Sequence, residues 1–325
     1  MTLYNSITET IGDTPLIRLN RISPPGSHIY VKSERTNPAG SVKDRAALAI
    51  IDDAVARGRL KEGGTIVEPT SGNMGIALAM IAAARGFHAV IVMPDSMTAE
   101  RISLMRAYGA EVILSPGSEG MRGAVETAER IVKERNGFLA DQFSNPANIS
   151  AHRTTTGPEI LRDLPDVDLV YVGFGTGGTA SGIGRVFADA GSKAKVIAIE
   201  PSESPLISEG RNGPHKIQGI GANFVPDNLD MSVISAIETV DSESAIRTAV
   251  ELARKEGILA GISSGANVYA ALRAARRDPS KKIVAILPDG GEKYLSLGMF
   301  EGERCQSRYP TTSRQPPSSN PRTYS

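Results

Sequence analysis

The sequence predicts an α/β protein with two three-layer domains, each a mainly parallel, twisted sheet with helices on both faces. The chain has 325 residues, a length typical of about two domains. Short β-branched apolar segments alternate with segments of helical periodicity through its middle, which is the pattern of parallel sheets joined by crossover helices. Glycine follows five of the helical segments, where a left-handed residue would end a helix.

Each expected element is a short periodic segment bounded by turn residues. Strands are expected at 65–68, 89–93, 111–114, 169–174, 195–199 and 282–287. Helices are expected at 41–57, 75–85, 99–108, 121–134, 180–190, 243–255 and 266–276. The capping glycines are Gly58, Gly86, Gly109, Gly137 and Gly257.

Composition limits the classes of partner and the compartment. Lys plus Arg and Asp plus Glu both number 36, so no net charge directs the chain to nucleic acid or to a membrane. Residues 1–10 lack the segments of a signal peptide, and no apolar run could span a bilayer. Cys305 is the only cysteine, so no internal disulfide is possible, and a reducing cytoplasmic location fits. We also expect no metal site. Residues 301–325 are rich in Ser, Pro, Thr and Arg, and we expect them to be disordered.

The segment 37–45, Asn-Pro-Ala-Gly-Ser-Val-Lys-Asp-Arg, is the first that carries chemistry. A Pro–Gly turn precedes Ser41 and Asp44, which have the spacing of a helix-capping pair. Lys43 therefore falls in the first turn of the next helix, where the helix dipole disfavours a cation. A lysine whose charge is disfavoured is a candidate Schiff-base amine, although a lone lysine is more often a solvated surface residue.

Two further segments connect an expected strand to an expected helix. Residues 68–75, Glu-Pro-Thr-Ser-Gly-Asn-Met-Gly, suit a carboxylate or phosphate at a helix N-terminus, and equally an ordinary capped turn. Residues 173–179, Gly-Phe-Gly-Thr-Gly-Gly-Thr, let the backbone approach an anion closely. Their glycines also match the dinucleotide fingerprint, and Glu200 stands where a ribose-binding acid would. A nicotinamide-dependent dehydrogenase is therefore an alternative, although it explains none of the other polar segments.

The fourth segment, 261–265, reads Gly-Ile-Ser-Ser-Gly and is expected to lead from a strand end into the helix at 266–276. Taken alone it is a plain serine N-cap. Because four polar loops would leave the carboxyl ends of parallel strands, we expect them to meet in one crevice.

Together these segments resemble the cysteine synthase (O-acetylserine sulfhydrylase) family, which has the fold of the tryptophan synthase β-subunit, fold type II among pyridoxal-phosphate enzymes. The resemblance runs from about residue 4 to residue 300. It includes four more segments: 11–16 (Ile-Gly-Asp-Thr-Pro-Leu), 142–148 (Gln-Phe-Ser-Asn-Pro-Ala-Asn), 155–160 (Thr-Thr-Gly-Pro-Glu-Ile) and 215–221 (His-Lys-Ile-Gln-Gly-Ile-Gly). It implies a smaller domain at 40–145 and a larger one at 1–39 plus 146–300, with the seam near Pro146.

The resemblance also implies pyridoxal 5′-phosphate as the cofactor and a role for each site residue. Lys43 would bind the cofactor as a Schiff base, Asn73 would hydrogen-bond its ring hydroxyl, and Ser264 would face its pyridine nitrogen. Its phosphate would be held by Gly175, Thr176, Gly177, Gly178 and Thr179. The amino-acid substrate would be bound by Thr70, Ser71, Gly72, Met74 and Gln142, with Asn73 also near its carboxylate.

The implied reaction converts O-acetyl-L-serine and sulfide to L-cysteine and acetate through an α-aminoacrylate, with Lys43 as the general base. A Ser264 hydroxyl, unlike a carboxylate, would not keep the ring nitrogen protonated, which suits β-elimination. The family further implies a homodimer and a crevice that can accept the C-terminal tail of serine acetyltransferase. A non-catalytic binding protein is thus a third hypothesis, and the intact set of Lys43, Asn73 and Ser264 argues against it.

Three positions depart from the family pattern. Met74 replaces a threonine, as in plant-type β-cyanoalanine synthases that use cyanide, whereas Thr176 keeps the cysteine synthase form. Asn223 replaces a glycine and would be tolerated if that position needs a positive φ. Leu297 follows Tyr-Leu-Ser where the family has threonine. A β-cyanoalanine synthase, or another enzyme that replaces the β-substituent of an O-activated serine, therefore stays an alternative, with the leaving group and second nucleophile open.

Overall fold

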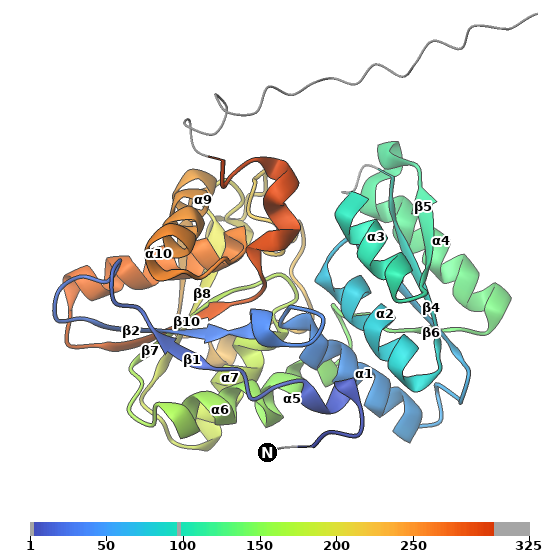
Figure 1. Cartoon of the computed structure of the whole chain (residues 1–325), viewed down its shortest axis with the longest axis horizontal. Helices are drawn as coiled ribbons and strands as arrows, with labels where there is room; N and C mark the ends of the chain where they lie inside the picture. The colour runs from blue at the N-terminus through green and yellow to red at the C-terminus, as the bar shows by residue number, and fades with distance from the viewer. Residues whose placement is uncertain (1–2, 96–98, 302–325) are drawn as a thin grey trace, which may run out of the picture.

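The computed structural model describes residues 3–95 and 99–301, and it confirms an α/β fold with mainly parallel sheets. Within these residues a six-stranded sheet has the order β1-β2-β10-β7-β8-β9, and a four-stranded sheet has the order β5-β4-β3-β6. The β1–β2 pair is antiparallel, and every other pairing in the two sheets is parallel. Figure 1 shows the two sheets beside each other, each with its own helices. Cys305 and the expected disorder of the tail from residue 302 onward lie outside the described residues.

Most elements follow one another along the chain with short connections, and a longer connection joins α8 to η4. The strands are β1 (Leu16–Arg18), β2 (His28–Ser33), β3 (Thr65–Pro69), β4 (His88–Pro94), β5 (Glu111–Ser115), β6 (Phe138–Leu139), β7 (Leu169–Gly173), β8 (Lys195–Pro201), β9 (Ala236–Val240) and β10 (Lys282–Leu287). The α-helices are α1 (Lys43–Ala56), α2 (Asn73–Arg85), α3 (Ala99–Ala107), α4 (Gly120–Arg135), α5 (Ala147–Thr154), α6 (Thr156–Asp163), α7 (Gly178–Asp189), α8 (Leu206–Glu209), α9 (Ser242–Glu251) and α10 (Ile262–Arg277). Short 3₁₀ turns are η1 (Ile7–Thr10), η2 (Glu34–Thr36), η3 (Gly117–Glu119), η4 (Met231–Val233) and η6 (Gly291–Leu297), and η5 (Leu252–Glu256) is a π-helical turn.

The larger sheet is apolar on both faces, as expected for a sheet covered by crossover helices. Along β10, Ile283, Ala285 and Leu287 belong to the core shared with α9 and α10. The alternate residues, Val284 and Ile286, belong to the core shared with α6 and α7. Figure 1 shows these helix pairs on opposite sides of the sheet. The period-two alternation along one strand therefore builds both cores.

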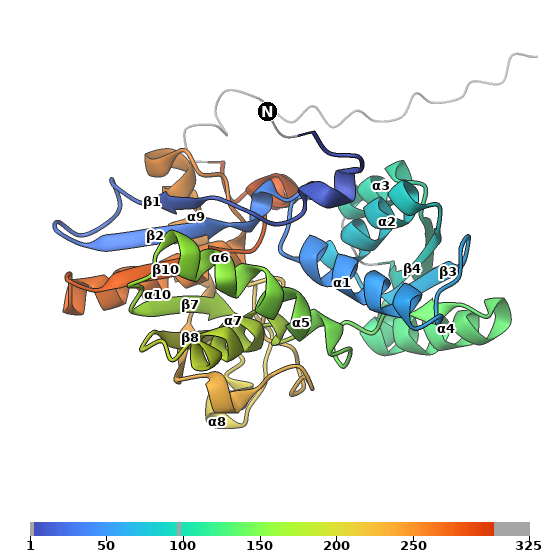
Figure 2. The ribbon, with the colours of Figure 1, turned by 90° about the horizontal axis from the view of Figure 1, so that it is seen from below.

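The smaller sheet is built in the same way. Ile91 and Met93 of β4 pack with α1 and α2, whereas Val90 and Val92 pack with α4. Helix α1 follows β2 of the larger sheet, yet its Ile50 side chain lies in the core of the smaller one. Figure 2 shows α1 and α5 lying between the two groups of strands. The chain thus passes from one sheet to the other at α1 and returns at α5.

The structure confirms all six predicted strands and all seven predicted helices, with ends that differ by a few residues. It adds β1, β2, β6, β9, α5, α6 and α8, which the sequence analysis does not predict. Four of the predicted capping glycines have positive φ, but helix α4 ends on Asn136 in the left-handed conformation, not on Gly137. Asparagine tolerates that conformation better than other residues with a side chain, which explains the difference.

Two details of the polar segments also differ from expectation. The segment at 261–265 does not follow a strand, because Ala260 makes only an isolated bridge to Gly290 and α10 already begins at Ile262. Asn223 is not among the described non-glycine residues with positive φ, so its glycine-like position needs no left-handed backbone here.

Candidate functional site

The polar segments meet at one edge of the larger sheet, beside the N-terminus of α2. The loops after β2 and β7 leave the carboxyl ends of the two parallel strands that flank β10 in that sheet, and the loop after β3 leaves the same end of its own strand. Backbone bonds tie two segments to the end of β10: Val42 N donates to Pro288 O (2.8 Å), and Gly261 N donates to Asp289 O (3.1 Å). Carboxyl ends of parallel strands are where ligands bind in α/β proteins.

Lys43 is the first residue of α1, as the sequence predicts. Its backbone N–H donates to Ser41 Oγ (3.2 Å), while Asp44 turns back to accept from Ala39 N (2.6 Å), so the reciprocal capping pair is not formed. Burial lowers the pKa of the Lys43 ammonium to about 8, and the nearby carboxylate of Asp289 opposes this shift. Lys43 therefore carries much more free amine at neutral pH than an ordinary lysine.

The loop before α2 is suited to a carboxylate. Thr70 Oγ1 accepts hydrogen bonds from Gly72 N and Gln142 Nε2, both at 3.3 Å, which holds Gln142 against the loop. Ser71, Gly72 and Asn73 are partly exposed at the start of the helix. The first N–H groups of a helix have no partner within it and attract anions.

Met74 is not brought together with the other predicted site residues. Its side chain is 1% exposed and lies in the core between α2 and the smaller sheet. Because α2 already begins at Asn73, the next residue is rotated by about 100° around the helix and faces inward. The predicted contact between this side chain and the substrate has no support in its position.

The glycine-rich loop at the start of α7 has the geometry of an anion cradle. Gly177 has φ +82°, and a Cβ at Gly175 would collide with the carbonyl oxygen of Gly219. Thr176 Oγ1 accepts from Asn148 Nδ2 (3.0 Å), whose other bond goes to the carbonyl of Gln142 (2.8 Å). The cradle and the carboxylate-binding loop are therefore linked through one asparagine.

Thr179, the last residue of the cradle, is held by a buried histidine. His152 Nε2 and Thr179 Oγ1 lie 3.1 Å apart, and His152 Nδ1 lies 2.8 Å from Thr156 Oγ1. Burial, with the nearby charges of Arg45 and Lys43, lowers the pKa of His152 well below its usual value. The imidazole is therefore neutral and acts as a hydrogen-bonding spacer.

Ser264 carries a buried hydroxyl without a partner. It lies in the first turn of α10, is 0% exposed, and its Oγ has no hydrogen-bond partner within residues 3–95 and 99–301. An unsatisfied buried hydroxyl costs about 1–3 kcal/mol, so such a group usually faces a ligand or a water. It is the type of partner that a pyridine nitrogen would take, and together with the cradle and Lys43 it fits pyridoxal phosphate.

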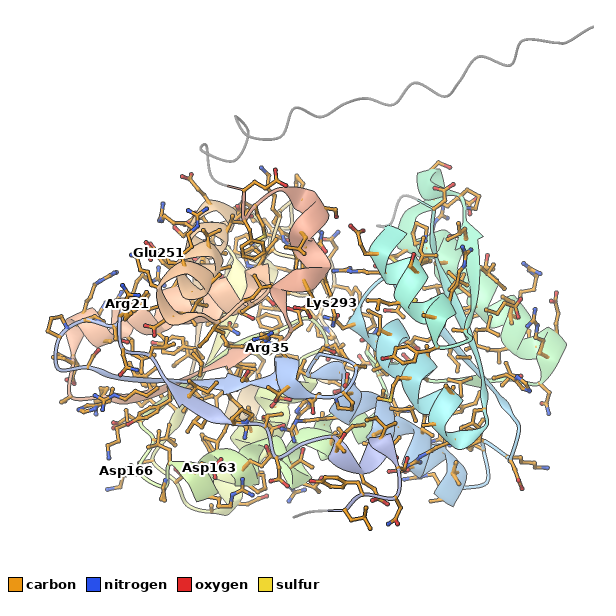
Figure 3. The ribbon with its side chains drawn as sticks, viewed as in Figure 1. Arg21, Arg35, Asp163, Asp166, Glu251 and Lys293 are labelled. Carbon is orange, nitrogen blue, oxygen red and sulfur yellow. The ribbon has the colours of Figure 1, made fainter. Side chains whose placement is uncertain are left out.

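The sequence analysis assigned no role to four buried charged residues around the site, although one of them, Glu68, begins the segment 68–75. Lys293 and Asp289 follow β10, and both contact Asn73. Arg101 of α3 donates to Ser71 O (3.1 Å) and to Gln218 Oε1 (2.7 Å). Glu68 accepts from Asp141 N (2.8 Å), and burial raises the pKa of this carboxyl to about 8. Figure 3 shows Lys293 between the two sheets. No local pattern singles out these residues, because their partners lie far away in the sequence.

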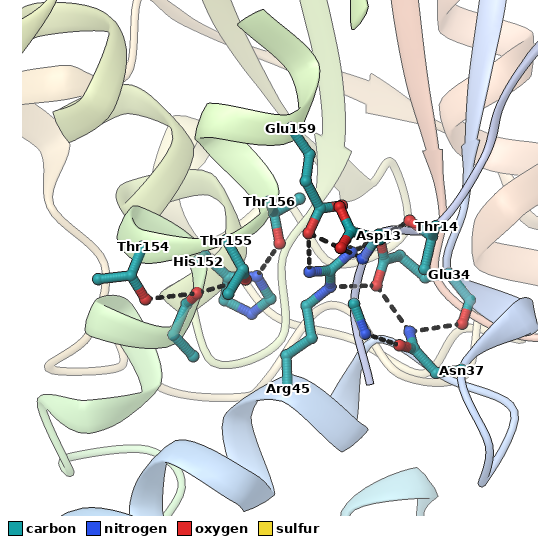
Figure 4. Close-up of polar contacts among 12 residues, drawn as sticks. Asp13, Thr14, Glu34, Asn37, Arg45, His152, Thr154, Thr155, Thr156 and Glu159 are labelled. Carbon is teal, nitrogen blue, oxygen red and sulfur yellow. Dashed lines mark hydrogen bonds and ion pairs between the residues drawn. The ribbon is translucent and has the colours of Figure 1, made fainter. Parts of the chain in front are cut away.

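A buried ionic network holds the N-terminal turn of α1 (Figure 4). Arg45 pairs with Glu34 at 2.7 Å and with Glu159 at 2.6 Å, and Lys32 pairs with the other oxygen of Glu159 at 2.7 Å. Burial opposes ionisation of Glu159, but its bonds to Arg45 and Lys32 outweigh this and lower its pKa to about 2. The network fixes the helix that carries Lys43 to the larger sheet.

Glu200 is not available to bind a ribose. Its oxygens accept from the backbone of Ile207 (3.1 Å) and Ser208 (3.0 Å), and the Ser208 hydroxyl bonds to it as well. The carboxylate caps the start of α8, which removes the acid that the dinucleotide alternative requires. The described residues contain no group of three or more His, Cys, Asp or Glu side chains able to hold a metal. None of their helices is both long and apolar enough to cross a membrane.

Comparison with known proteins gives the family. The family model described as "Pyridoxal-phosphate dependent enzyme" matches residues 7–289. The chain belongs to the pyridoxal-phosphate dependent enzymes. Within that family it is 46% identical over 300 residues to a cysteine synthase of Staphylococcus aureus, covering 91% of this chain and 97% of that one. It is 49% identical over 305 residues to an O-ureido-L-serine synthase of Streptomyces lavendulae, covering 93% and 94%.

Solved structures of this pyridoxal-phosphate family have the same fold. An O-ureido-L-serine synthase structure has a TM-score of 0.90 at 48% identity and covers 93% of this chain and 96% of that one. A cysteine synthase structure from Entamoeba histolytica has a TM-score of 0.88 at 40% identity and covers 94% of each. These relatives confirm the fold and the family that the sequence motifs predict.

Proposed function

We propose that the chain is a cysteine synthase, which converts O-acetyl-L-serine and sulfide to L-cysteine and acetate. The observation that carries this proposal is the meeting of Lys43, with its lowered pKa, the anion cradle at 175–179 and the unpartnered Ser264 hydroxyl at one edge of the sheet. The similarity to cysteine synthases over nearly the whole chain supports it.

Bound pyridoxal phosphate supplies a carbonyl carbon for the amino group and an electron sink for the α-carbon. The backbone N–H groups and hydroxyls of the loop would hold its phosphate; these residues are Gly175, Thr176, Gly177, Gly178 and Thr179. Ser264 would face the ring nitrogen, and Asn73 would donate to the ring hydroxyl. Lys43 would hold the cofactor in the resting enzyme.

The substrate is held by its carboxylate while Lys43 moves one proton. Thr70, Ser71, Gly72 and Gln142 bind the α-carboxylate at the start of α2. Lys43 Nζ takes the α-proton as the Cβ–O bond breaks, and acetate leaves with the electron pair. A Cβ–S bond then forms with sulfide, and Lys43 returns the proton to the α-carbon. A lysine pKa near 8 suits both directions of this transfer.

The test follows from the role of Lys43. Purified protein should absorb in the visible region, and borohydride should fix the cofactor to the peptide that contains Lys43. With O-acetyl-L-serine and sulfide it should form L-cysteine and acetate in equal amounts. The function is refuted if cofactor binds and is fixed at Lys43, yet no cysteine forms.

The second candidate function is O-ureido-L-serine synthesis, which differs from cysteine synthesis only in the attacking nucleophile. The 49% identity to an O-ureido-L-serine synthase favours this candidate. Disconnecting the Cβ–O bond of O-ureido-L-serine gives N-hydroxyurea as the attacking group. β-Cyanoalanine synthesis from cyanide is the third member of this set. Competition of sulfide, cyanide and N-hydroxyurea for one activated serine, with products identified by mass spectrometry, distinguishes the three.

The assembly and the domain division are also part of the proposal. We place the smaller domain at 40–145, since β3 to β6 lie within it, and the larger at 1–39 plus 146–300. We propose a cytoplasmic homodimer whose site can take the C-terminal tail of serine acetyltransferase. Light scattering tests the dimer, and a monomer would contradict it. Cysteine synthase activity with and without a peptide of that tail tests the second point, and an unchanged activity would contradict it.

A further inference from the structure

Asn73 lies between two buried side chains of opposite charge. Lys293 is 5% exposed, and its Nζ donates to Asn73 Oδ1 at 2.9 Å. Asp289 is 1% exposed, and its Oδ2 accepts from Asn73 Nδ2 at 2.8 Å. Tyr294 Oη donates to the same carboxylate oxygen at 2.7 Å. The two ends of one amide are thus recognised separately, by residues more than 200 positions away in the chain.

These partners allow one orientation of the amide. An ammonium group can only donate hydrogen bonds, so it requires the amide oxygen. Asp289 Oδ2 accepts from two donors, so it requires the amide nitrogen. A flipped Asn73 would set its N–H₂ against Lys293 and its oxygen against Asp289, which would lose two charge-assisted bonds. We propose that Lys293 and Asp289 are positioning residues, which fix the Asn73 amide so that its one remaining N–H is presented to the cofactor hydroxyl.

Lys293 also ties this amide to the turn before Lys43. Its other two bonds go to the carbonyls of Gly40 (3.0 Å) and Ala39 (3.3 Å). One ammonium therefore joins η6 after the larger sheet, the turn before α1 and the first residue of α2. All three of its N–H groups have acceptors, so the lysine has a single position. The orientation of Asn73 and the path of the chain to Lys43 are set by the same group.

This inference rests on the proposed function, since it assigns Asn73 to the cofactor hydroxyl. The test compares Lys293→Met, which removes the donors, with Lys293→Arg, which keeps them. Lys255→Met is the matched control, because Lys255 is exposed and pairs with Glu251, one helical turn away. Three quantities are measured: the affinity of the apoprotein for pyridoxal phosphate, the pH dependence of the visible absorption of the bound cofactor, and kcat separately from KM.

Lys293→Met should weaken cofactor affinity by tenfold or more, as expected for the loss of a hydrogen bond to a charged group. It should also shift the pH at which the visible absorption changes. Lys293→Arg should recover most of both effects, and Lys255→Met should match the wild type. In an Asn73→Ala background, Lys293→Met should have a clearly smaller effect than in the wild type, because the amide that it orients is already gone and only its bonds to Ala39 and Gly40 are left to lose.

Two outcomes would overturn the inference: equal effects of Lys293→Met and Lys255→Met, or full additivity with Asn73→Ala. If Lys293→Met does not fold, Lys293→Gln takes its place, because its amide can accept as well as donate and so no longer dictates the orientation. Failure of the wild type to bind pyridoxal phosphate would instead reject the proposed function. Normal wild-type binding with an unaffected Lys293→Met rejects the positioning role alone.

Discussion

Replacing Arg45 with methionine should strongly destabilise the fold, because it leaves two buried carboxylates without their main partner. The Glu34 side chain is 0% exposed and that of Glu159 is 7% exposed, and both are paired with Arg45 at 2.6–2.7 Å. Removing one member of a buried ion pair typically costs about 3–5 kcal/mol. The lowered pKa of Glu159 acts in the same direction, but Lys32 shares in causing it and stays in the variant, so only part of that shift belongs to Arg45. The expected effect is far above that of a surface pair.

The assay is urea unfolding followed by far-ultraviolet circular dichroism, because the chain has no tryptophan to report by fluorescence. With a slope of about 3 kcal/mol per molar urea, the midpoint of Arg45→Met should fall by about 1 M or more. Arg153→Met is the control: its pair with Asp189 is more than half exposed and should contribute less than about 1 kcal/mol. Equal midpoint shifts in the two variants would refute the reasoning.

The stabilisation of the fold by the Arg45–Glu159 pair should depend on pH in a defined direction. The pKa of Glu159 is lower in the folded state than in the unfolded chain, so its stabilisation is present above about 4.5 and is lost as the pH falls toward about 2. The difference in the free energy of unfolding between wild type and Arg45→Met should therefore become smaller as the pH falls from about 4.5 toward about 2. A difference that stays constant from pH 6 to pH 2 would show that Arg45 acts by packing alone.

Three further predictions concern residues around the cofactor. Ser264→Asp should retain the cofactor but lower kcat by tenfold or more, since a carboxylate would keep the ring nitrogen protonated; unchanged turnover would place Ser264 elsewhere. Met74→Thr should destabilise the fold by about 2 kcal/mol, because it creates a cavity and buries a hydroxyl. A changed ratio of the rates with sulfide and with cyanide would show instead that the Met74 side chain reaches the substrate. Burial raises the pKa of Glu68 to about 8, so wild-type stability should fall as the pH rises from about 4.5 through 8, and this part of the pH dependence should be absent from Glu68→Gln. Parallel urea midpoints of the two proteins across that range would contradict this cause.

The sequence predicts elements where local pattern and environment agree. The segment 282–287 is a run of β-branched and aliphatic residues, and β10 has the same bounds. Strand β6 has two residues and β1 has three, too few for any periodicity to be detected. Helices α5 and α6 form an almost continuous segment that contains three consecutive threonines at 154–156 and a Gly-Pro pair at 157–158, so tertiary packing, not intrinsic propensity, makes it helical.

Position Met74 shows why a site cannot be deduced from adjacency in sequence alone. Met74 stands between Asn73 and Gly75 in the motif. If these three residues formed a loop, all three could be exposed. Helix α2, however, starts at Asn73 and buries every residue from Met74 to Ala82, because the smaller sheet and the neighbouring helices surround it. The side chains of two adjacent residues therefore point in different directions, one toward the site and the other into the core.

In the proposed function, two different kinds of structure would recognise the two ends of the cofactor, and this difference decides what the sequence can predict. The phosphate cradle consists of glycines and hydroxyls within five consecutive residues, and its N–H groups are set by the local backbone and the start of α7. Such a site is encoded locally and can be predicted from a motif. Asn73 also belongs to a motif, but its amide has a defined orientation only because Lys293 and Asp289, after the last strand, contact it from the other sheet. If Asn73 takes the proposed role, recognition of the ring hydroxyl would depend on the relative placement of the two sheets, whereas recognition of the phosphate would depend mainly on the local backbone.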